Sequence, residues 1–427
     1  MRPFLLVTLI FAALFLAGAA SPPSPGVIVL QCGKVFDGES ASLLGPQEIL
    51  VDKGKIVWMS KSVGRPLGAE VVDLSERTCL PGFADVHAHL MFEPGDVDKQ
   101  MVSQSSAAKT LRGFANARAM LMAGFTTIRV PGDMDLQWGA ADLKHAVDSG
   151  LVEGPRMFVA SHALSSTGGH GDWAHFAPEF GIRGTAIADG PDEIRKMVRT
   201  ELRNGSDWIK IMATGGFLSA GDEPGTATYR EAELRAAVEE TEALGHHVCA
   251  HAHGAEGIKR AVRAGVRSIE HGTFIDDEGL RLMEQKGTFL VPTWGALDWL
   301  LDHAKQAGFP DYALEKLERY RPQLLNRRAA VVKSRVRIAY GTDVGVYPQG
   351  EAWREFISLV KSGIPPLRAL RAATSEAADL LERPDLGGLA AGRTADIIAL
   401  PGDPLHDIQV VSKVDFVMKE GRVFRRP

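Results

Sequence analysis

The sequence predicts an α/β protein made of a (β/α)8 TIM barrel and a small β-sandwich to which both chain ends contribute. Two observations predict this class. Between positions 81 and 384, short apolar runs alternate with longer amphipathic stretches, as in parallel strands joined by helices. Residues 21–80 and 385–427 instead carry short β-branched runs separated by Gly, Asp and Pro, as small antiparallel strands do.

The extreme N-terminus differs from the rest of the chain. Met1 and Arg2 precede an apolar run from Phe4 to Leu16, and small residues follow up to Ala20. This order is typical of a cleavable signal peptide, and the run is short for a membrane span. We therefore predict a signal peptide at 1–20, no stable membrane anchor, and a secreted or periplasmic protein. An uncleaved anchor is the alternative.

The two terminal arms share the same short, interrupted strands. Expected strands lie at 27–30, 48–51, 55–59, 71–73, 395–400, 410–419 and 422–424. Of the three cysteines, Cys32 and Cys79 could pair if the N-terminal strands bring them together, but spacing alone does not show it. Three unpaired thiols, with Cys249 as the third, fit the sequence as well.

The middle of the chain contains eight candidate strands. They lie at 83–86, 126–130, 157–161, 208–212, 248–251, 268–271, 288–292 and 337–341. Helical patterns between them include 107–123, 191–204, 230–244 and 254–264. An open doubly wound sheet is the alternative, but no G-x-G-x-x-G turn follows the first strand.

Polar residues recur where these strands end, and in a barrel the carboxyl ends of the strands form the active-site face. His87 and His89 follow the first strand, and two residues so spaced on extended backbone project to the same side. His251 and His271 end two later strands, and a neutral imidazole is a common metal ligand. His253 shares the face of His251, so the choice between these two histidines stays open.

Two further residues complete the candidate set. Lys210 lies in an otherwise apolar strand, so its amine must be paired or neutral. A salt bridge is one resolution; the favoured one is a carbamate formed with carbon dioxide, which can bridge two cations. Asp343 follows the last strand and could bind a metal and move a proton, or could simply cap the next helix.

The residues His87, His89, Lys210, His251, His271 and Asp343 together resemble the ligand set of the binuclear-metal branch of the amidohydrolase superfamily. The resemblance runs over nearly the whole chain, including 392–396. The stretches 208–216, 251–254, 268–273 and 341–343 are similar to the prolidase-like dipeptidases and the related ochratoxin amidase. Members of that group cleave dipeptides or N-acyl amino acids with a free C-terminal carboxylate.

The resemblance implies a metal-dependent hydrolase of amide bonds that works by attack of a metal-bridging hydroxide. His87, His89 and Asp343 would hold one divalent ion, His251 and His271 the other, and carboxylated Lys210 would bridge them. Zinc is the favoured metal, although such ligands also suit manganese or cobalt. Asp343 would be the catalytic acid–base, and a homo-oligomer is expected.

The resemblance also suggests substrate contacts. His162 would polarise the scissile carbonyl, and His253 would lie near the substrate. The residue that binds the substrate carboxylate stays open: Tyr229, Arg129 and Arg230 are candidates, and each is more often structural or exposed. Trp294 and Trp299 would line the pocket or simply pack in the core.

Rival functions are a lactonase, esterase or phosphotriesterase with the same ligands, a deaminase, and a noncatalytic secreted binding protein. A deaminase would carry Glu three residues after His251, where this chain has Gly254. A noncatalytic relative would usually lack ligands, and none is missing here. The net charge of −5 and the lack of a long basic run argue against nucleic-acid binding. The expected partner is a small peptide or N-acyl amino acid.

Overall fold

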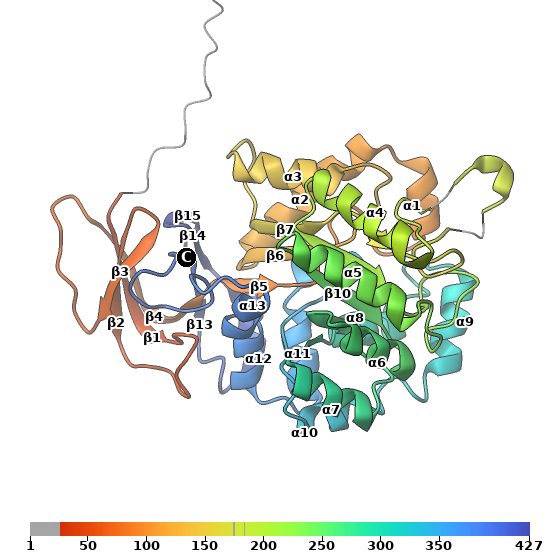
Figure 1. Cartoon of the computed structure of the whole chain (residues 1–427). Helices are drawn as coiled ribbons and strands as arrows, with labels where there is room; N and C mark the ends of the chain where they lie inside the picture. Colours follow the sequence, from red (N-terminus) through yellow and green to blue (C-terminus); the bar gives the residue numbers. More distant parts are fainter. Residues whose placement is uncertain (1–25, 174–175, 183) are drawn as a thin grey trace, which may run out of the picture.

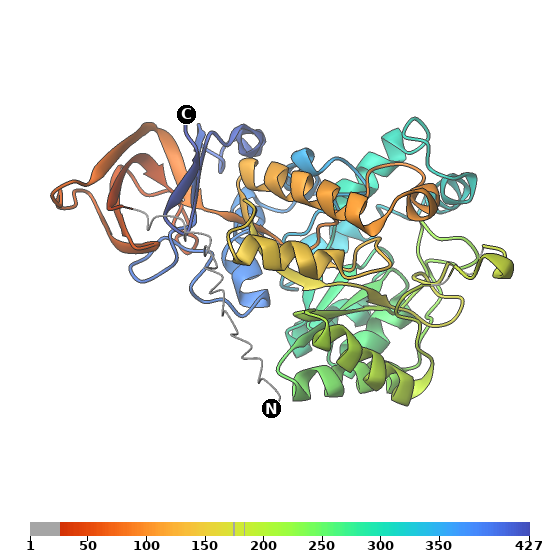
Figure 2. The same ribbon diagram turned by 90° about the horizontal axis from the view of Figure 1, so that it is seen from above.

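The computed structural model describes residues 26–173, 176–182 and 184–427, so the expected signal peptide at 1–20 lies outside the described residues (Figure 1). The structure is mixed α/β, with a terminal sheet on one side and parallel strands surrounded by helices on the other (Figures 1 and 2). Within the described residues, no helix has the length and apolarity needed to cross a membrane.

The terminal sheet has seven strands in the order β15-β14-β13-β4-β1-β2-β3. Their bounds are β1 Ile28–Val35, β2 Gln47–Asp52, β3 Lys55–Ser60, β4 Glu70–Pro81, β13 Ile397–Pro401, β14 Phe416–Lys419 and β15 Arg422–Arg425. Both chain ends contribute to this sheet, because β13 pairs antiparallel with β4. The sequence predicted a β-sandwich, whereas these strands form a single sheet. Its buried side chains, among them Leu30, Ile49 and Phe416, form a separate apolar core.

Three details of this sheet differ from the expected small antiparallel strands. β1 and β4 pair in parallel, which the long connection through β2 and β3 permits. β4 is twelve residues long, whereas the sequence pattern indicated only 71–73. The expected strand at 410–419 is split, because a 3-10 helix, Ile408–Lys413, precedes β14.

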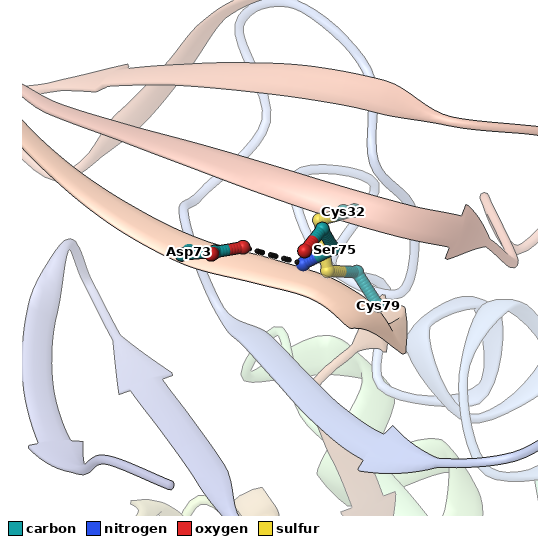
Figure 3. The surroundings of a disulfide bond; sticks show 4 residues. All are labelled: Cys32, Asp73, Ser75 and Cys79. Carbon is teal, nitrogen blue, oxygen red and sulfur yellow. Dashed lines mark hydrogen bonds between the residues drawn. A yellow bond between two sulfur atoms is a disulfide. The ribbon is translucent and has the colours of Figure 1, made fainter.

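A disulfide joins Cys32 in β1 to Cys79 in β4, which answers the question that the spacing left open (Figure 3). The β1–β4 register shifts between Cys32 and Lys34. A Cβ atom on Gly33 would lie 1.9 Å from the carbonyl oxygen of Ser75, so only glycine fits this irregularity. Cys249 is a buried free thiol.

The parallel strands form two groups. A three-stranded sheet has the order β5-β6-β7, and a five-stranded sheet has the order β12-β11-β10-β9-β8. Their bounds are β5 Phe83–Asp85, β6 Phe125–Pro131, β7 Arg156–Ala160, β8 Ala163–Leu164, β9 Trp208–Met212, β10 His247–Ala252, β11 Ser268–His271 and β12 Phe289–Val291. Seven of the eight expected strands are thus confirmed in type and position, and β8 was not foreseen.

The prediction of an eighth strand at 337–341 is wrong, because this segment does not form a regular strand. This segment makes a single parallel bridge, between Ile338 and Leu290. It nevertheless hydrogen-bonds to both neighbours: Ala339 N donates to Leu290 O at 3.0 Å, and Val86 N donates to Tyr340 O at 2.8 Å. On the other side, Asp207 N donates to Val159 O at 2.6 Å. Backbone bonds therefore join the two parallel sheets at both edges.

Helices alternate with these strands and cover their outside (Figure 2). The α-helices are α1 Val97–Ser103, α2 Ser106–Met122, α3 Gly139–Asp148, α4 Gly190–Arg203, α5 Glu231–Ala243, α6 Ala255–Ala264, α7 Asp277–Lys286, α8 Trp294–His303, α9 Asp311–Tyr320, α10 Arg328–Lys333, α11 Arg354–Lys361, α12 Pro366–Ala372 and α13 Ser375–Leu380. α6 is representative: it buries Ile258, Ala261 and Val262 on one face and ends at Gly265, whose φ of 103° favours glycine.

The terminal sheet contacts the beginnings of the parallel strands. Arg156, the first residue of β7, makes a salt bridge to Asp396 at 2.7 Å and a second one to Glu420. Near the start of β5, Gly82 N donates to Asp396 O at 2.9 Å. The opposite, carboxyl ends of the strands are therefore left free to form a site.

Candidate metal centre

The carboxyl ends of the parallel strands bring most of the expected site residues together. His87 and His89 follow β5, Lys210 lies in β9, His251 lies in β10, and His271 ends β11. One cavity is lined by all of them and by two residues of the connecting segments: His87, His89, Lys210, His251, His271, His253 and Asp343. Because parallel strands end at one edge, residues from distant parts of the sequence meet here.

Asp343 is the meeting point of the first histidine group. Its Oδ1 lies 3.0 Å from Nε2 of His89 and 3.4 Å from Nε2 of His87. One ligand atom each of His87, His271 and Asp343 lie within 4.8 Å of one another. This arrangement of two nitrogens and one oxygen could hold a divalent cation.

The hydrogen bonds of His87 and His89 fix which ring nitrogen faces the cluster. Nδ1 of His87 lies 2.6 Å from Oε2 of Glu270, and Nδ1 of His89 lies 2.6 Å from the carbonyl oxygen of Gly132. Both partners only accept, so both Nδ1 atoms carry the proton. The lone pairs of both Nε2 atoms are therefore left toward Asp343, as metal ligands require.

Glu270 is itself held by Arg129, and both side chains are fully buried. Nη2 of Arg129 donates to Oε1 of Glu270 at 2.8 Å, and Oγ of Ser268 donates to the same oxygen at 2.5 Å. Burial alone would raise the pKa of Glu270, but Arg129 and His87 lower it to about 2. Glu270 thus stays ionised and accepts from His87. Arg129 lies in the strand core, so its structural alternative holds and it is not a contact of the substrate carboxylate.

A second histidine group lies beside the first. One ring nitrogen each of His251, His253 and His271 lie within 4.8 Å of one another, so His271 belongs to both groups. Nε2 of His251 donates to Gly215 O at 3.1 Å, which leaves its Nδ1 free. Burial, and then the neighbouring histidines, lower the pKa of His251 and His271 well below 6.5. Neutral rings are what a metal needs.

His253 therefore lies closer to the ligands than the resemblance implied. Its ring stacks on that of His271 with centroids 4.9 Å apart, and its Nδ1 is bonded to Oγ1 of Thr273 at 2.8 Å. Burial is the main cause that lowers its pKa to about 3. The structure places both His251 and His253 in one group, so their positions alone do not decide which of the two is the metal ligand.

Lys210 lies in the same cavity, with its side chain almost fully buried. Within the described part of the chain, its amine makes no hydrogen bond and no salt bridge. Burial is the first cause that lowers its pKa. The salt bridge, one of the two expected resolutions, is therefore not formed among the described residues, and the carbamate stays a prediction.

Backbone strain gathers at this centre. His271, Asp343 and Thr293 have φ angles of 70°, 61° and 49°, in the left-handed region that non-glycine residues rarely adopt. Asp343 N donates to His87 O at 2.7 Å, and Nδ1 of His271 is bonded to Oγ1 of Thr293 at 2.8 Å. Each such residue costs about 1–3 kcal/mol, and such residues cluster at functional sites.

The expected substrate contacts fall in three places. His162 lines the cavity, but both its ring nitrogens are engaged, Nδ1 with Glu201 at 2.9 Å and Nε2 with Gln137 O at 2.8 Å. Tyr229 does not line the cavity, contrary to its expected role in substrate binding. It is buried, and its hydroxyl donates to Ala188 O at 2.9 Å. Arg230 is exposed at the start of α5. Trp294 lines the cavity, whereas Trp299 does not.

His170 is a cavity residue that the sequence analysis missed. Its Nδ1 is bonded to Oγ of Ser219 at 2.6 Å, and its ring stacks on His251 with centroids 4.4 Å apart. Asp222 lies 3.6 Å away and is bonded to the buried ammonium of Lys316 at 2.6 Å. Glycines on both sides of His170 were the available signal, but this histidine does not end an expected strand.

Comparisons with known proteins agree with this geometry. A sequence profile described as the amidohydrolase family matches residues 78–424. Ochratoxinase from Aspergillus niger is 33% identical over 437 residues, which cover 96% of this chain and 88% of the relative. The crystal structure of a Xaa-Pro dipeptidase with bound methionine matches with a TM-score of 0.87 at 34% identity, covering 94% of this chain and 100% of that chain. A prolidase complexed with N-methylphosphonate-L-proline matches with a TM-score of 0.86 at 34% identity and the same coverage.

Proposed function

Because this chain belongs to the amidohydrolase family, we propose that it hydrolyses the amide bond of dipeptides or N-acyl amino acids that carry a free C-terminal carboxylate. The observation that carries the proposal is the cluster of histidines and Asp343 around Lys210 in a single cavity. The names of the relatives support the substrate class: a dipeptidase with bound methionine, a prolidase with a proline analogue, and ochratoxinase.

We infer that the joined parallel sheets are the (β/α)8 barrel, since the similar solved structures are amidohydrolase-fold proteins and the sheets are linked at both edges. We also propose that the protein is exported. The Cys32–Cys79 disulfide supports export, because disulfides persist mainly in oxidising compartments. Detection of the protein in the cytosolic fraction alone would contradict this proposal. A homo-oligomer remains a prediction.

The donor set fits two divalent cations, because two groups of ligand atoms lie side by side and the Lys210 amine has no partner among the described residues. His87, His89 and Asp343 would hold one ion, and His251 and His271 the other, with the carbamate of Lys210 shared between them. When bound, the ions would polarise the amide carbonyl and make water a nucleophile at neutral pH. Nitrogen and oxygen donors favour zinc.

The protein's own groups supply proton transfer and orientation. Asp343 would accept a proton from the attacking water and deliver it to the leaving amine. For His162 to bind the carbonyl oxygen, its Nε2–H must exchange the carbonyl of Gln137 for that of the substrate.

The test is amino-acid release from a panel of dipeptides and N-acyl amino acids, using protein loaded with zinc and assayed for metal content. We expect release that requires a free C-terminal carboxylate, so the amidated version of each substrate serves as its control. Equal cleavage of the amidated substrates would contradict the carboxylate requirement. Silence on every amide together with turnover of lactones would replace the proposal with a lactonase, and release of ammonia would replace it with a deaminase.

A further inference from the structure

One side of the cavity is formed by an apolar face of α8. Trp294, Leu297 and Leu300 all line the cavity, and their spacing of three residues places them on one side of the helix. They are shielded from bulk water, with exposed fractions of 5%, 9% and 7%. Their apolar surface is therefore turned to the cavity interior rather than to solvent.

Two more apolar residues face the same space. Leu324 and Val331 line the cavity from the segment around α10. Arg328 of α10 ties this segment to α8, because its Nη2 donates to Asp298 at 2.8 Å and its guanidinium lies 5.0 Å from the centre of the Trp294 ring. We call Trp294, Leu297, Leu300, Leu324 and Val331 the apolar wall.

The apolar wall begins at the metal centre. Thr293, the residue before α8, is bonded to His271 of the ligand cluster at 2.8 Å. A substrate whose amide carbonyl lies at the cluster therefore has one of its flanking groups within reach of Trp294. The lining continues from Trp294 along Leu297 and Leu300 to Leu324 and Val331, so a long flanking group has apolar surface to follow.

Two arginines line this side of the cavity, and both make salt bridges. Arg328 is paired with Asp298, and Arg327 is paired with Asp277. A charged substrate group placed against Trp294, Leu297 or Leu300 would exchange its water for apolar surface, which is unfavourable. A neutral apolar group would instead remove both its own surface and that of the wall from water.

We propose that the apolar wall binds a large apolar substituent next to the scissile amide bond, an aliphatic or aromatic side chain, and so selects hydrophobic substrates. This proposal rests on the proposed amide hydrolysis for its substrate and names the class of substrate that the site prefers. Each buried methylene should raise kcat/KM about fourfold.

The direct test is calorimetric binding of acetate, butyrate and hexanoate to the metal-loaded protein. The carboxylate is common to the three probes, so only the tail differs. We expect Kd to fall roughly 16-fold for each added pair of methylenes. Hexanoate binding no tighter than acetate would overturn the proposal, whether or not the protein cleaves amides.

Variants locate the effect. Leu300→Ala and Leu297→Ala should flatten the dependence on tail length, so that hexanoate loses more affinity than acetate does. The matched control is Leu301→Ala on the same helix, because Leu301 packs against the core without lining the cavity. If Leu301→Ala flattens the series as much as Leu300→Ala does, the wall is not the binding surface and the proposal fails.

The amide assay separates this proposal from the proposed function. Two substrate series are compared, one with growing side chains on the C-terminal residue and one with growing acyl groups on glycine. Preference for longer groups in either series supports the proposal and shows which side of the amide meets the wall. If kcat/KM for amide cleavage does not depend on group length in either series, the proposal is overturned while the proposed function stays intact.

Discussion

Replacement of Glu270 by glutamine tests how the ligand His87 is oriented. Glu270 is fully buried and accepts from Arg129, Ser268 and His87. Glutamine keeps the shape of the side chain but removes its negative charge. Arg129, also fully buried, would then lack its counter-ion, and the amide could turn its NH2 group toward Nδ1 of His87.

The structure allows the size of the effect to be estimated. Removal of one partner from a buried ion pair costs about 3–5 kcal/mol, a large part of a typical unfolding free energy of about 5–15 kcal/mol. Loss of an outer partner of a metal-ligating histidine typically weakens metal binding by about 10–100-fold. Both effects are expected in Glu270→Gln.

The first assay is urea unfolding of the metal-free protein. The second assay measures the metal content and the metal-binding affinity of the reconstituted protein. The matched control is Glu240→Gln, which breaks an exposed pair with Arg199 and should cost less than about 1 kcal/mol. The double variant Arg129→Met, Glu270→Leu removes both buried charges. It should recover stability relative to Glu270→Gln but not metal affinity. Unfolding within about 0.5 kcal/mol of the unmodified protein, with unchanged metal affinity, would refute the argument.

Three further predictions concern the metal centre and the terminal sheet. Lys210→Ala should lose metal and activity together, and unmodified protein given 13C-bicarbonate should show a carbamate carbon by NMR; full activity with two metals retained in the variant would contradict the role of Lys210. Cys32→Ser with Cys79→Ser should lower the unfolding free energy by about 4 kcal/mol, because the bond closes a long loop, with a separation of 47 residues; denaturant unfolding measures this loss, and reductant should abolish the difference. The bond from Arg65 is the main cause that lowers the pKa of Glu48 from 4.5 to about 2, so this pair stabilises the fold above pH 4.5 and the contribution is lost as the pH falls toward 2. Glu48→Gln should therefore show a melting temperature that declines less steeply over that interval, and an unchanged slope would contradict the assignment.

The sequence by itself determined most of the strands and the polar residues that follow them. Short apolar runs mark buried parallel strands because both faces of such strands are covered. A histidine or lysine at the end of such a run conflicts with burial unless it has a function, so His87, Lys210 and His271 could be found without coordinates. Strand-like composition at both ends likewise predicted that the two ends combine in one β-unit, although the prediction was a β-sandwich and the structure has a single sheet.

Only the tertiary structure decided what depends on neighbours distant in sequence. Pairing of Cys32 with Cys79 follows from the β1–β4 register, and the buried position of Tyr229 follows from its bond to Ala188. His170 reaches the cavity from a connecting segment, where no periodic pattern marks its direction. The Nδ1 proton of His87 is fixed by Glu270, which is 183 residues away in the sequence. The local sequence pattern shows which residues of a segment are buried. It does not show which distant segments the fold brings into contact, and these features depend on such contacts.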